Sequence, residues 1–201
     1  MGIISSSFTF VRYSVEGELP DNFWDFAAKC ITSCSFRDID DTLDERSLGW
    51  VSVHNMFDTD PQYEDYAVGD YIVLSLRIDE RKIPTKLLKK YCLKEEVRLK
   101  KKKELAKLSK SQKMEIKENV HWQLLKQIPP QAATYDICWN LAESVLYFFS
   151  TTEKVQSELE NFFKETFGLS LQLQIPYLTA EHLLEPDKHY ELARLSPQIF
   201  I

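Results

Sequence analysis

Glycine, proline and cysteine are all scarce in this chain of 201 residues. The five glycines lie far apart, so neither a P-loop nor a dinucleotide-binding fingerprint can form. The eight prolines follow no repeat, which excludes collagen-like and low-complexity classes. With 44% hydrophobic and 28% charged residues, the composition is that of a globular protein with a substantial core.

Long apolar runs are also missing. No window reaches the roughly 18 uncharged apolar residues of a membrane span, and residues 1–15 lack the pattern of a secretory signal. We therefore expect a cytoplasmic protein without membrane contact. In that reducing compartment, we expect four free thiols rather than disulfides, at Cys30, Cys34, Cys92 and Cys138.

Residues that carry chemistry form no recognisable catalytic motif. Cys30 and Cys34 have a spacing that suits two zinc ligands, but Cys30 belongs to an apolar helical face and no CxxC or HxxxH pair is present. Seven carboxylates offer ligands for Mg²⁺, although a solvated acidic loop explains them as well: Asp38, Asp40, Asp41, Asp44, Glu45, Asp58 and Asp60. We expect no catalytic residue, metal or other cofactor.

Apolar periodicity predicts a mixture of strands and helices. Alternation with a period of two predicts strands at residues 7–15, 48–53, 71–78, 135–140, 144–149 and 169–177. A period of 3.6 predicts a helix within residues 19–33, a second one that begins at a Ser150–Glu153 capping box and stops at Gly168, and a short one at residues 179–184. Their apolar faces carry Phe23, Phe26, Ala27, Cys30 and Ile31, and Val155, Leu159, Phe162, Phe163 and Phe167.

A long basic helical pattern occupies the middle of the chain. It opens at Pro84, with Leu87, Leu88, Tyr91 and Val97 as its apolar positions. A capping box at Ser109 and Gln112 predicts a break near Leu108 and a restart through Met114, Ile116, Val120, Leu124 and Leu125, before Pro129 and Pro130 end the region. The element order predicts an α+β fold with mixed or antiparallel sheets, amphipathic helices and a long basic helical segment. We expect one unit over residues 1–201, with possible sub-lobes 1–83 and 127–201 joined by basic helices 84–126.

Charge is distributed unevenly along the chain, whose net charge is −6. Residues 77–126 hold 17 basic and 7 acidic side chains, whereas residues 1–76 have a net charge of −10 and residues 127–201 a net charge of −6. The four consecutive lysines from Lys100 to Lys103 surround a helix, so this turn must be exposed. Such a segment is typical of phosphate binding; a solvated helix face, an acidic protein partner and the chain's own acidic flanks are the alternatives.

An ordered series of short motifs resembles the bacterial recombination-associated protein family RdgC. The series comprises Gly49-Trp50-Val51, residues 69–84 (GDYIVLSLRIDERKIP), the basic helices of residues 86–120, Leu124-Leu125, Trp139 on a strand, and a helix followed by a strand at residues 154–176. The resemblance covers residues 49–177. It implies an α+β, ring-forming dimer that encloses duplex DNA through backbone contacts, and therefore a location at the nucleoid.

Two features differ from the family pattern. Family members are typically longer, so we expect a short member that lacks the C-terminal part that helps to close the ring. The loop after the second basic helix reads Pro130-Gln131-Ala132-Ala133, where the family tends to have a basic residue and a phenylalanine that contributes to a dimer contact. The predicted DNA-binding residues are Arg81, Lys82, Lys86, Lys89, Lys90, Lys94, Arg98, Lys100, Lys101, Lys102, Lys103, Lys107, Lys110, Lys113 and Lys117.

Three functions remain as hypotheses. The first is a non-catalytic, sequence-independent protein that clamps double-stranded DNA as a homodimer and modulates recombination, with single-stranded DNA as an alternative substrate. The second is an interaction protein whose basic helices bind an acidic partner or form an intermolecular helical bundle. The third is a Mg²⁺-dependent exonuclease that would use Asp38, Asp40 or Asp41.

Overall fold

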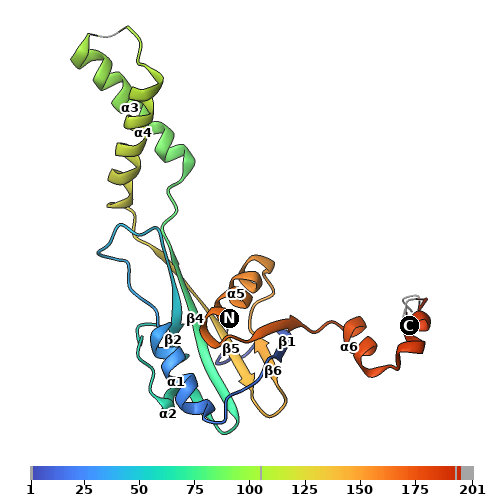
Figure 1. Cartoon of the computed structure of the whole chain (residues 1–201). Helices are drawn as coiled ribbons and strands as arrows, with labels where there is room; N and C mark the ends of the chain where they lie inside the picture. Colours follow the sequence, from blue (N-terminus) through green and yellow to red (C-terminus); the bar gives the residue numbers. More distant parts are fainter. Residues whose placement is uncertain (1, 105, 193, 196–201) are drawn as a thin grey trace. The chain divides into compact units, whose positions relative to one another are not determined.

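The computed structural model describes residues 2–104, 106–192, 194 and 195, which form two compact units (Figure 1). Unit 1 contains the described residues of Met1–Cys34, Val51–Leu76 and Tyr135–Ile201. Unit 2 contains those of Ser35–Trp50 and Arg77–Thr134, which include the whole basic segment. No helix among the described residues has the length and apolar character that a membrane span requires.

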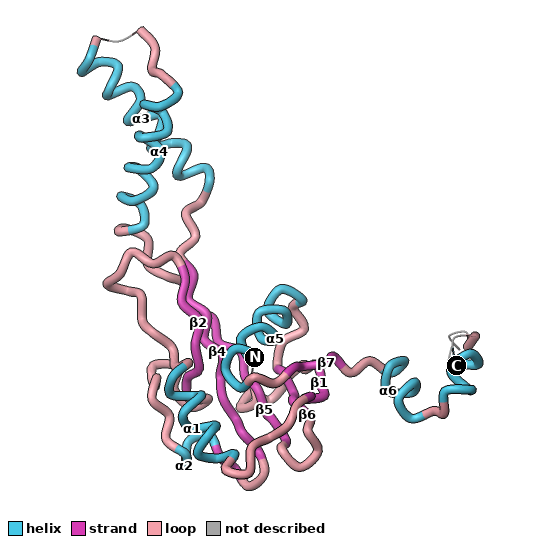
Figure 2. Tube along the Cα trace, viewed as in Figure 1, coloured by secondary structure: helices cyan, strands magenta, loops and turns pink. Residues whose placement is uncertain are grey.

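The fold is α+β, as predicted, and its strands form one sheet (Figure 2). The sheet order is β2-β4-β5-β6-β1-β7, β3 pairs with β4, and β1 pairs antiparallel with both β6 and β7. The strands are β1 (Val11–Glu16), β2 (Arg46–Val51), β3 (Ala67–Val68), β4 (Tyr71–Glu80), β5 (Gln131–Asn140), β6 (Val145–Phe148) and β7 (Ser170–Leu173). The helices are α1 (Phe23–Ser33), α2 (Tyr63–Tyr66), α3 (Thr85–Lys103), α4 (Lys110–Leu125), α5 (Glu153–Phe167), α6 (Pro176–Leu183) and α7 (His189–Leu192), with a 3₁₀ turn at Pro186–Lys188.

Trp139 lies at the centre of the core of unit 1. Its ring is fully buried and meets Phe23 of α1 at 5.4 Å and Phe163 and Phe167 of α5 at 5.1 and 5.3 Å, between ring centroids. Both helices therefore cover the same side of β5. Edge-to-face contacts of this kind add to the free energy gained by burying the rings.

The apolar face predicted for α5 is confirmed, but its N-cap differs from the prediction. Every residue of that face is buried, and Gly168 ends the helix in the left-handed region with φ of 70°. The N-cap is Thr152, not the predicted Ser150. The Ser150 hydroxyl accepts a hydrogen bond from the Thr152 N–H. The hydroxyl thus stabilises the turn before the helix and caps no helical N–H.

Two strands of unit 1, β1 and β7, are shorter than predicted. β1 begins only at Val11, and Phe8 and Phe10 before it are about half exposed. β7 ends at Leu173 rather than at Tyr177, because Pro176 starts α6. Proline has no N–H to donate to a strand ladder, and it is well suited to the first turn of a helix, where that N–H would have no partner.

Unit 2 carries a helical hairpin formed by α3 and α4. The predicted capping box is confirmed, since the Ser109 hydroxyl accepts from the Gln112 N–H and the Gln112 side chain accepts from the Ser109 N–H. A small core holds the hairpin together, with Leu108, Ile116, Val120 and Leu124 buried against Ile83, Leu87, Leu88, Tyr91, Cys92, Leu99 and Ile128.

Two residues that the sequence analysis counted among the apolar positions of these helices are exposed. Val97 of α3 and Met114 of α4 have exposed fractions of 53% and 60%. Val97 follows Leu87 by ten residues, and at 100° per residue it points away from the packed face. Cys92 and Leu99, seven residues apart, occupy that face instead.

Gly49 permits a close backbone contact within unit 2. The segment at Ser35 pairs with Trp50 as a parallel bridge, and the Phe36 N–H donates to the Trp50 carbonyl at 3.0 Å. A Cβ atom at Gly49 would lie 2.2 Å from Phe36 Cα and 2.4 Å from Phe36 N. Only glycine fits here without a shift of the backbone.

We expect Gly49→Ala to lower the free energy of unfolding by about 2–3 kcal/mol, because the new methyl group would press on main-chain atoms that cannot rotate away. Urea unfolding measures the loss. The control is Gly69→Ala, where φ is +61° and, apart from its chain neighbours, none of the described residues comes within 4 Å of the added Cβ, so only about 1 kcal/mol of backbone strain is expected. Equal losses for the two variants would contradict the close contact.

Candidate nucleic-acid interface

The helical hairpin places most of the predicted DNA-binding side chains in solvent. Lys100 is half-buried and Arg81 is buried, and all the others are exposed. The turn from Lys100 to Lys103 is thus accessible, as the desolvation cost of four adjacent lysines requires. The exposed candidates are Lys82, Lys86, Lys89, Lys90, Lys94, Arg98, Lys101, Lys102, Lys103, Lys107, Lys110, Lys113 and Lys117.

One side of α3 gathers lysines without carboxylates. At 100° per residue, these lysines share the arc opposite the packed residues Leu87, Tyr91 and Leu99. Of the acidic residues of α3, Glu95 lies on the packed side and Glu96 borders the arc, four residues before Lys100; both are half-buried. The arc therefore has a net positive charge, carried by Lys86, Lys89, Lys90, Lys94, Lys100 and Lys101.

The hairpin has a second surface of different character. A groove of about 420 Å³ runs between α3 and α4, and its apolar lining includes Leu99, Ile116 and Trp122. Its polar lining is mixed, with Glu95, Lys103, Gln112, Glu115, Asn119, Gln123 and Lys126. The lysines of α4 lie on the other side of the helix, because Lys110, Lys113 and Lys117 each precede a groove residue by two positions, which is a rotation of about 200°.

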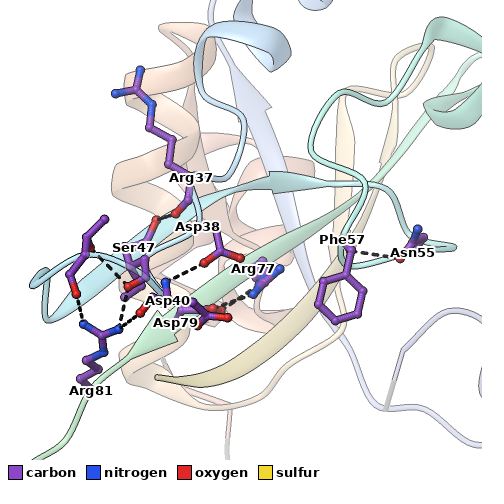
Figure 3. Close-up of polar contacts among 11 residues, drawn as sticks. Arg37, Asp38, Asp40, Ser47, Asn55, Phe57, Arg77, Asp79 and Arg81 are labelled. Carbon is purple, nitrogen blue, oxygen red and sulfur yellow. Dashed lines mark hydrogen bonds and ion pairs between the residues drawn. The ribbon is translucent and has the colours of Figure 1, made fainter. Parts of the chain in front are cut away.

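Arg77 and Asp79, at the end of β4, form a buried ion pair (Figure 3). Arg77 Nε donates to Asp79 Oδ1 at 2.9 Å and Nη2 donates to Oδ2 at 2.7 Å, while the guanidinium lies 4.1 Å from the ring centre of Phe36. The hydrogen bonds to Asp79 raise the pKa of Arg77 above its ordinary value. This bidentate pair positions β4 and leaves no net charge for a ligand.

Arg81 does not fit its predicted role as a phosphate ligand. Its exposed fraction is 5%, and Nη2 donates to the carbonyls of Ile39 and Asp40 at 2.7 Å each (Figure 3). Nη1 donates to the carbonyls of Thr42 and Asp44. Both Nη groups are therefore bonded to main-chain oxygens and shape the loop of residues 39–44, while the buried Nε has no hydrogen-bond partner within the described residues. A planar group with five N–H donors can hold several carbonyls in this way.

The acidic loop is organised by the same contacts. Asp38 Oδ1 accepts from the Asp40 N–H at 2.7 Å, and Asp44 Oδ2 accepts from the Thr42 hydroxyl at 2.9 Å. These carboxylates stabilise turns. Within the described part of the chain, no group of three or more His, Cys, Asp or Glu residues is arranged to hold a metal ion.

The sequence interpretation omitted some exposed residues of the hairpin. Lys126, at the C-cap of α4, is exposed and lines the groove. Leu93 and Trp122 have exposed fractions of 53% and 51%, although their types are usually buried. The count of basic residues in 77–126 already included Lys126, so the sequence offered a signal for it. The exposure of Leu93 and Trp122 follows only from how the helices pack.

We expect Arg81→Lys to destabilise the protein by about 2–3 kcal/mol, because an ammonium group cannot keep the forked set of bonds to the loop carbonyls. Chemical unfolding measures this loss. Arg98→Lys is the matched control: Arg98 is exposed on α3 and pairs with Glu95 only at 3.4 Å, so its change should stay within about 0.5 kcal/mol. A loss at Arg98 as large as at Arg81 would contradict the structural role of Arg81.

Comparison with known families agrees with the order of motifs in the sequence. Residues 18–183 match the family model described as "Putative exonuclease, RdgC", which covers more than four-fifths of the chain. A search of curated proteins finds no match. The matched range includes α1 and so extends beyond the residues 49–177 that carried the resemblance. The chain therefore belongs to the RdgC family of bacterial recombination-associated proteins.

Proposed function

We propose that this protein is a non-catalytic, sequence-independent DNA-binding protein of the nucleoid that modulates recombination. Its substrate is double-stranded DNA, and the lysine-bearing surface of the α3–α4 hairpin is its binding site. The observation that carries the proposal is the arc of α3 on which exposed lysines gather without a carboxylate. The family assignment supports the link to recombination.

The chemistry of this surface favours contacts to the DNA backbone. Lysine is a point charge on a flexible stem, which neutralises phosphate without reading a base edge. Arginine is the residue that makes bidentate contacts with guanine, and of the two arginines predicted to bind DNA, Arg81 is buried and Arg98 is exposed. Affinity should therefore depend steeply on salt and little on base sequence.

We propose further that the active form is a homodimer that clamps the duplex. One hairpin reaches a limited number of phosphates, and a second copy doubles the contacts that a single encounter can make. Linking two weak sites in this way raises the effective affinity far above that of either one. The oligomeric state follows from light scattering on a size-exclusion column, with and without a duplex.

The exposed apolar residues of the hairpin support a second candidate, an interaction protein. Leu93, Val97, Met114 and Trp122 are each at least half exposed, and the groove beside Trp122 has mixed charges. Large exposed apolar side chains are typical of protein interfaces. In that case the lysines would bind an acidic protein or bring hairpins together in an intermolecular bundle.

The two candidates differ in how the purified protein binds a labelled duplex of random sequence across a salt series. We expect log affinity to fall linearly with log salt concentration and to be similar for unrelated sequences, because counterion release drives the binding. A parallel sample with Mg²⁺ tests the exonuclease in the family description, and we expect intact DNA. No binding at low salt would overturn the DNA proposal in favour of a protein partner, and degradation lost in Asp38→Asn or Asp40→Asn would establish a nuclease.

We expect replacement of Lys100, Lys101, Lys102 and Lys103 by glutamine to weaken duplex binding at least about tenfold. The salt slope should fall by about 1 for each of these lysines that contacts phosphate. The unfolding free energy should change by no more than about 1 kcal/mol, the usual scale for charges at the end of a helix.

A matched control removes the same charge from unit 1. Lys29, Lys154, Lys164 and Lys188 are exposed and lie outside the hairpin, so their replacement by glutamine should leave the slope and affinity nearly unchanged. If both quadruple variants lose affinity equally, binding responds to net charge alone and the hairpin is not the site.

A further inference from the structure

A cleft of about 570 Å³ opens in unit 1, between α1 and the segment that leads into α2. The two helices lie side by side in Figure 1. The α1 side of the cleft provides Trp24, Asp25, Ala28 and Thr32, and the other side provides Asp60, Pro61, Gln62, Tyr63 and Tyr66. The cleft lies outside the hairpin and has no part in the proposed DNA contact.

Three aromatic rings, contributed by both sides, form the aromatic wall of the cleft. Trp24 and Tyr63 meet edge to face with centroids 5.1 Å apart, and Tyr63 and Tyr66 do so at 5.9 Å. Tyr63 is 51% exposed, so part of its ring is open to solvent, whereas Tyr66 is 2% exposed. The Tyr66 hydroxyl has no hydrogen-bond partner within the described residues. Exposed aromatic faces of this kind attract cations through the ring quadrupole.

Two carboxylates add negative charge to the aromatic wall. Asp25 and Asp60 line the cleft from opposite sides and both are exposed, and no lysine or arginine is among the described residues that line it. Neither carboxylate group forms a hydrogen bond or an ion pair with the described part of the chain. Asp25 lies in the first turn of α1, where its negative charge interacts favourably with the helix dipole. Asp60 has no such role.

We propose that this cleft docks a lysine or arginine side chain of a basic segment in a partner protein. The alkyl stem would lie along Trp24 and Tyr63, and the cationic head would pair with Asp25 and Asp60. Charge complementarity selects this partner, because residues 1–76 have a net charge of −10 and the cleft itself has two free carboxylates. A phosphate backbone would be repelled here, so the cleft and the hairpin recognise partners of opposite charge.

The test measures the anisotropy of a labelled peptide of alternating lysine and glycine with the full chain at physiological salt. A peptide with glutamine in place of lysine measures binding that needs no charge. We expect saturable binding of the lysine peptide alone, weakened at least tenfold by Asp25→Asn with Asp60→Asn. Tyr63→Leu should weaken it as well, because it removes the ring while leaving the charge unchanged.

The matched control is Glu143→Gln with Glu165→Gln, which removes two exposed carboxylates of unit 1 outside the cleft. We expect this variant to bind the peptide within twofold of the original chain. Equal losses in both double variants, or no effect of Tyr63→Leu, would mean that general charge attracts the peptide, and the docking site would be wrong. Full displacement by an equal concentration of spermidine would overturn the protein partner in favour of a small polyamine.

Duplex binding of the cleft variants separates this inference from the proposed function. Asp25→Asn with Asp60→Asn should leave duplex affinity and its salt slope nearly unchanged, because neither residue belongs to the hairpin. A loss of duplex binding parallel to the loss of peptide binding would contradict an independent cleft.

Discussion

The desolvation cost of the basic segment is the constraint that shapes unit 2. Residues 77–126 carry 17 basic side chains, and burying even a few unpaired ammonium groups would cost more than the rest of the fold could offset. A helical hairpin meets this constraint, since only one side of each helix packs. Its core consists of a few buried residues, mainly on α4, and α3 contributes no fully buried residue.

Two arginines of the same segment are nevertheless buried, and each is satisfied differently. Arg77 pairs with Asp79, so opposite charges compensate within the interior. Arg81 has carbonyl oxygens as partners, and the positive charge is distributed over the dipoles of a loop. Both positions use the planar geometry of guanidinium, which lysine lacks. Within one basic segment, two of the arginines thus build structure, while most of the lysines are exposed.

The chain combines surfaces of opposite charge. The lysine arc of α3 suits a polyanion, whereas the aromatic cleft with Asp25 and Asp60 suits a cation. Salt would screen the charge interactions at both surfaces. The hairpin would depend on many weak ionic contacts, whereas the cleft would depend on a few contacts, one of which is apolar. The two proposed sites would recognise partners of opposite charge, DNA at the hairpin and a basic protein at the cleft. The negative charge of unit 1 also discourages nonspecific wrapping of DNA around it.

The sequence by itself determined the order of the longer elements, the exposed lysine turn, the Ser109 capping box and the family, because periodicity, charge and local capping depend on neighbours along the chain. The short elements α2 and β3 were not predicted. The family resemblance rested on the order of such local signals over residues 49–177, and the family match covers residues 18–183. The ends of the strands could not be predicted from local signals alone. Pro176 could be read as the end of a strand or as the start of a helix, and the packing of the segment decides between them.

Only the tertiary structure decided which basic residues are free and which aromatics meet. Arg81 and Lys82 are neighbours in one charged run, yet Arg81 is buried and donates to carbonyls some 40 positions earlier, whereas Lys82 is exposed and pairs with Glu80. Likewise, Trp24 and Tyr63 are far apart in sequence and share one cleft. Burial and long-range contacts depend on how the chain returns to itself, and no local pattern contains that information.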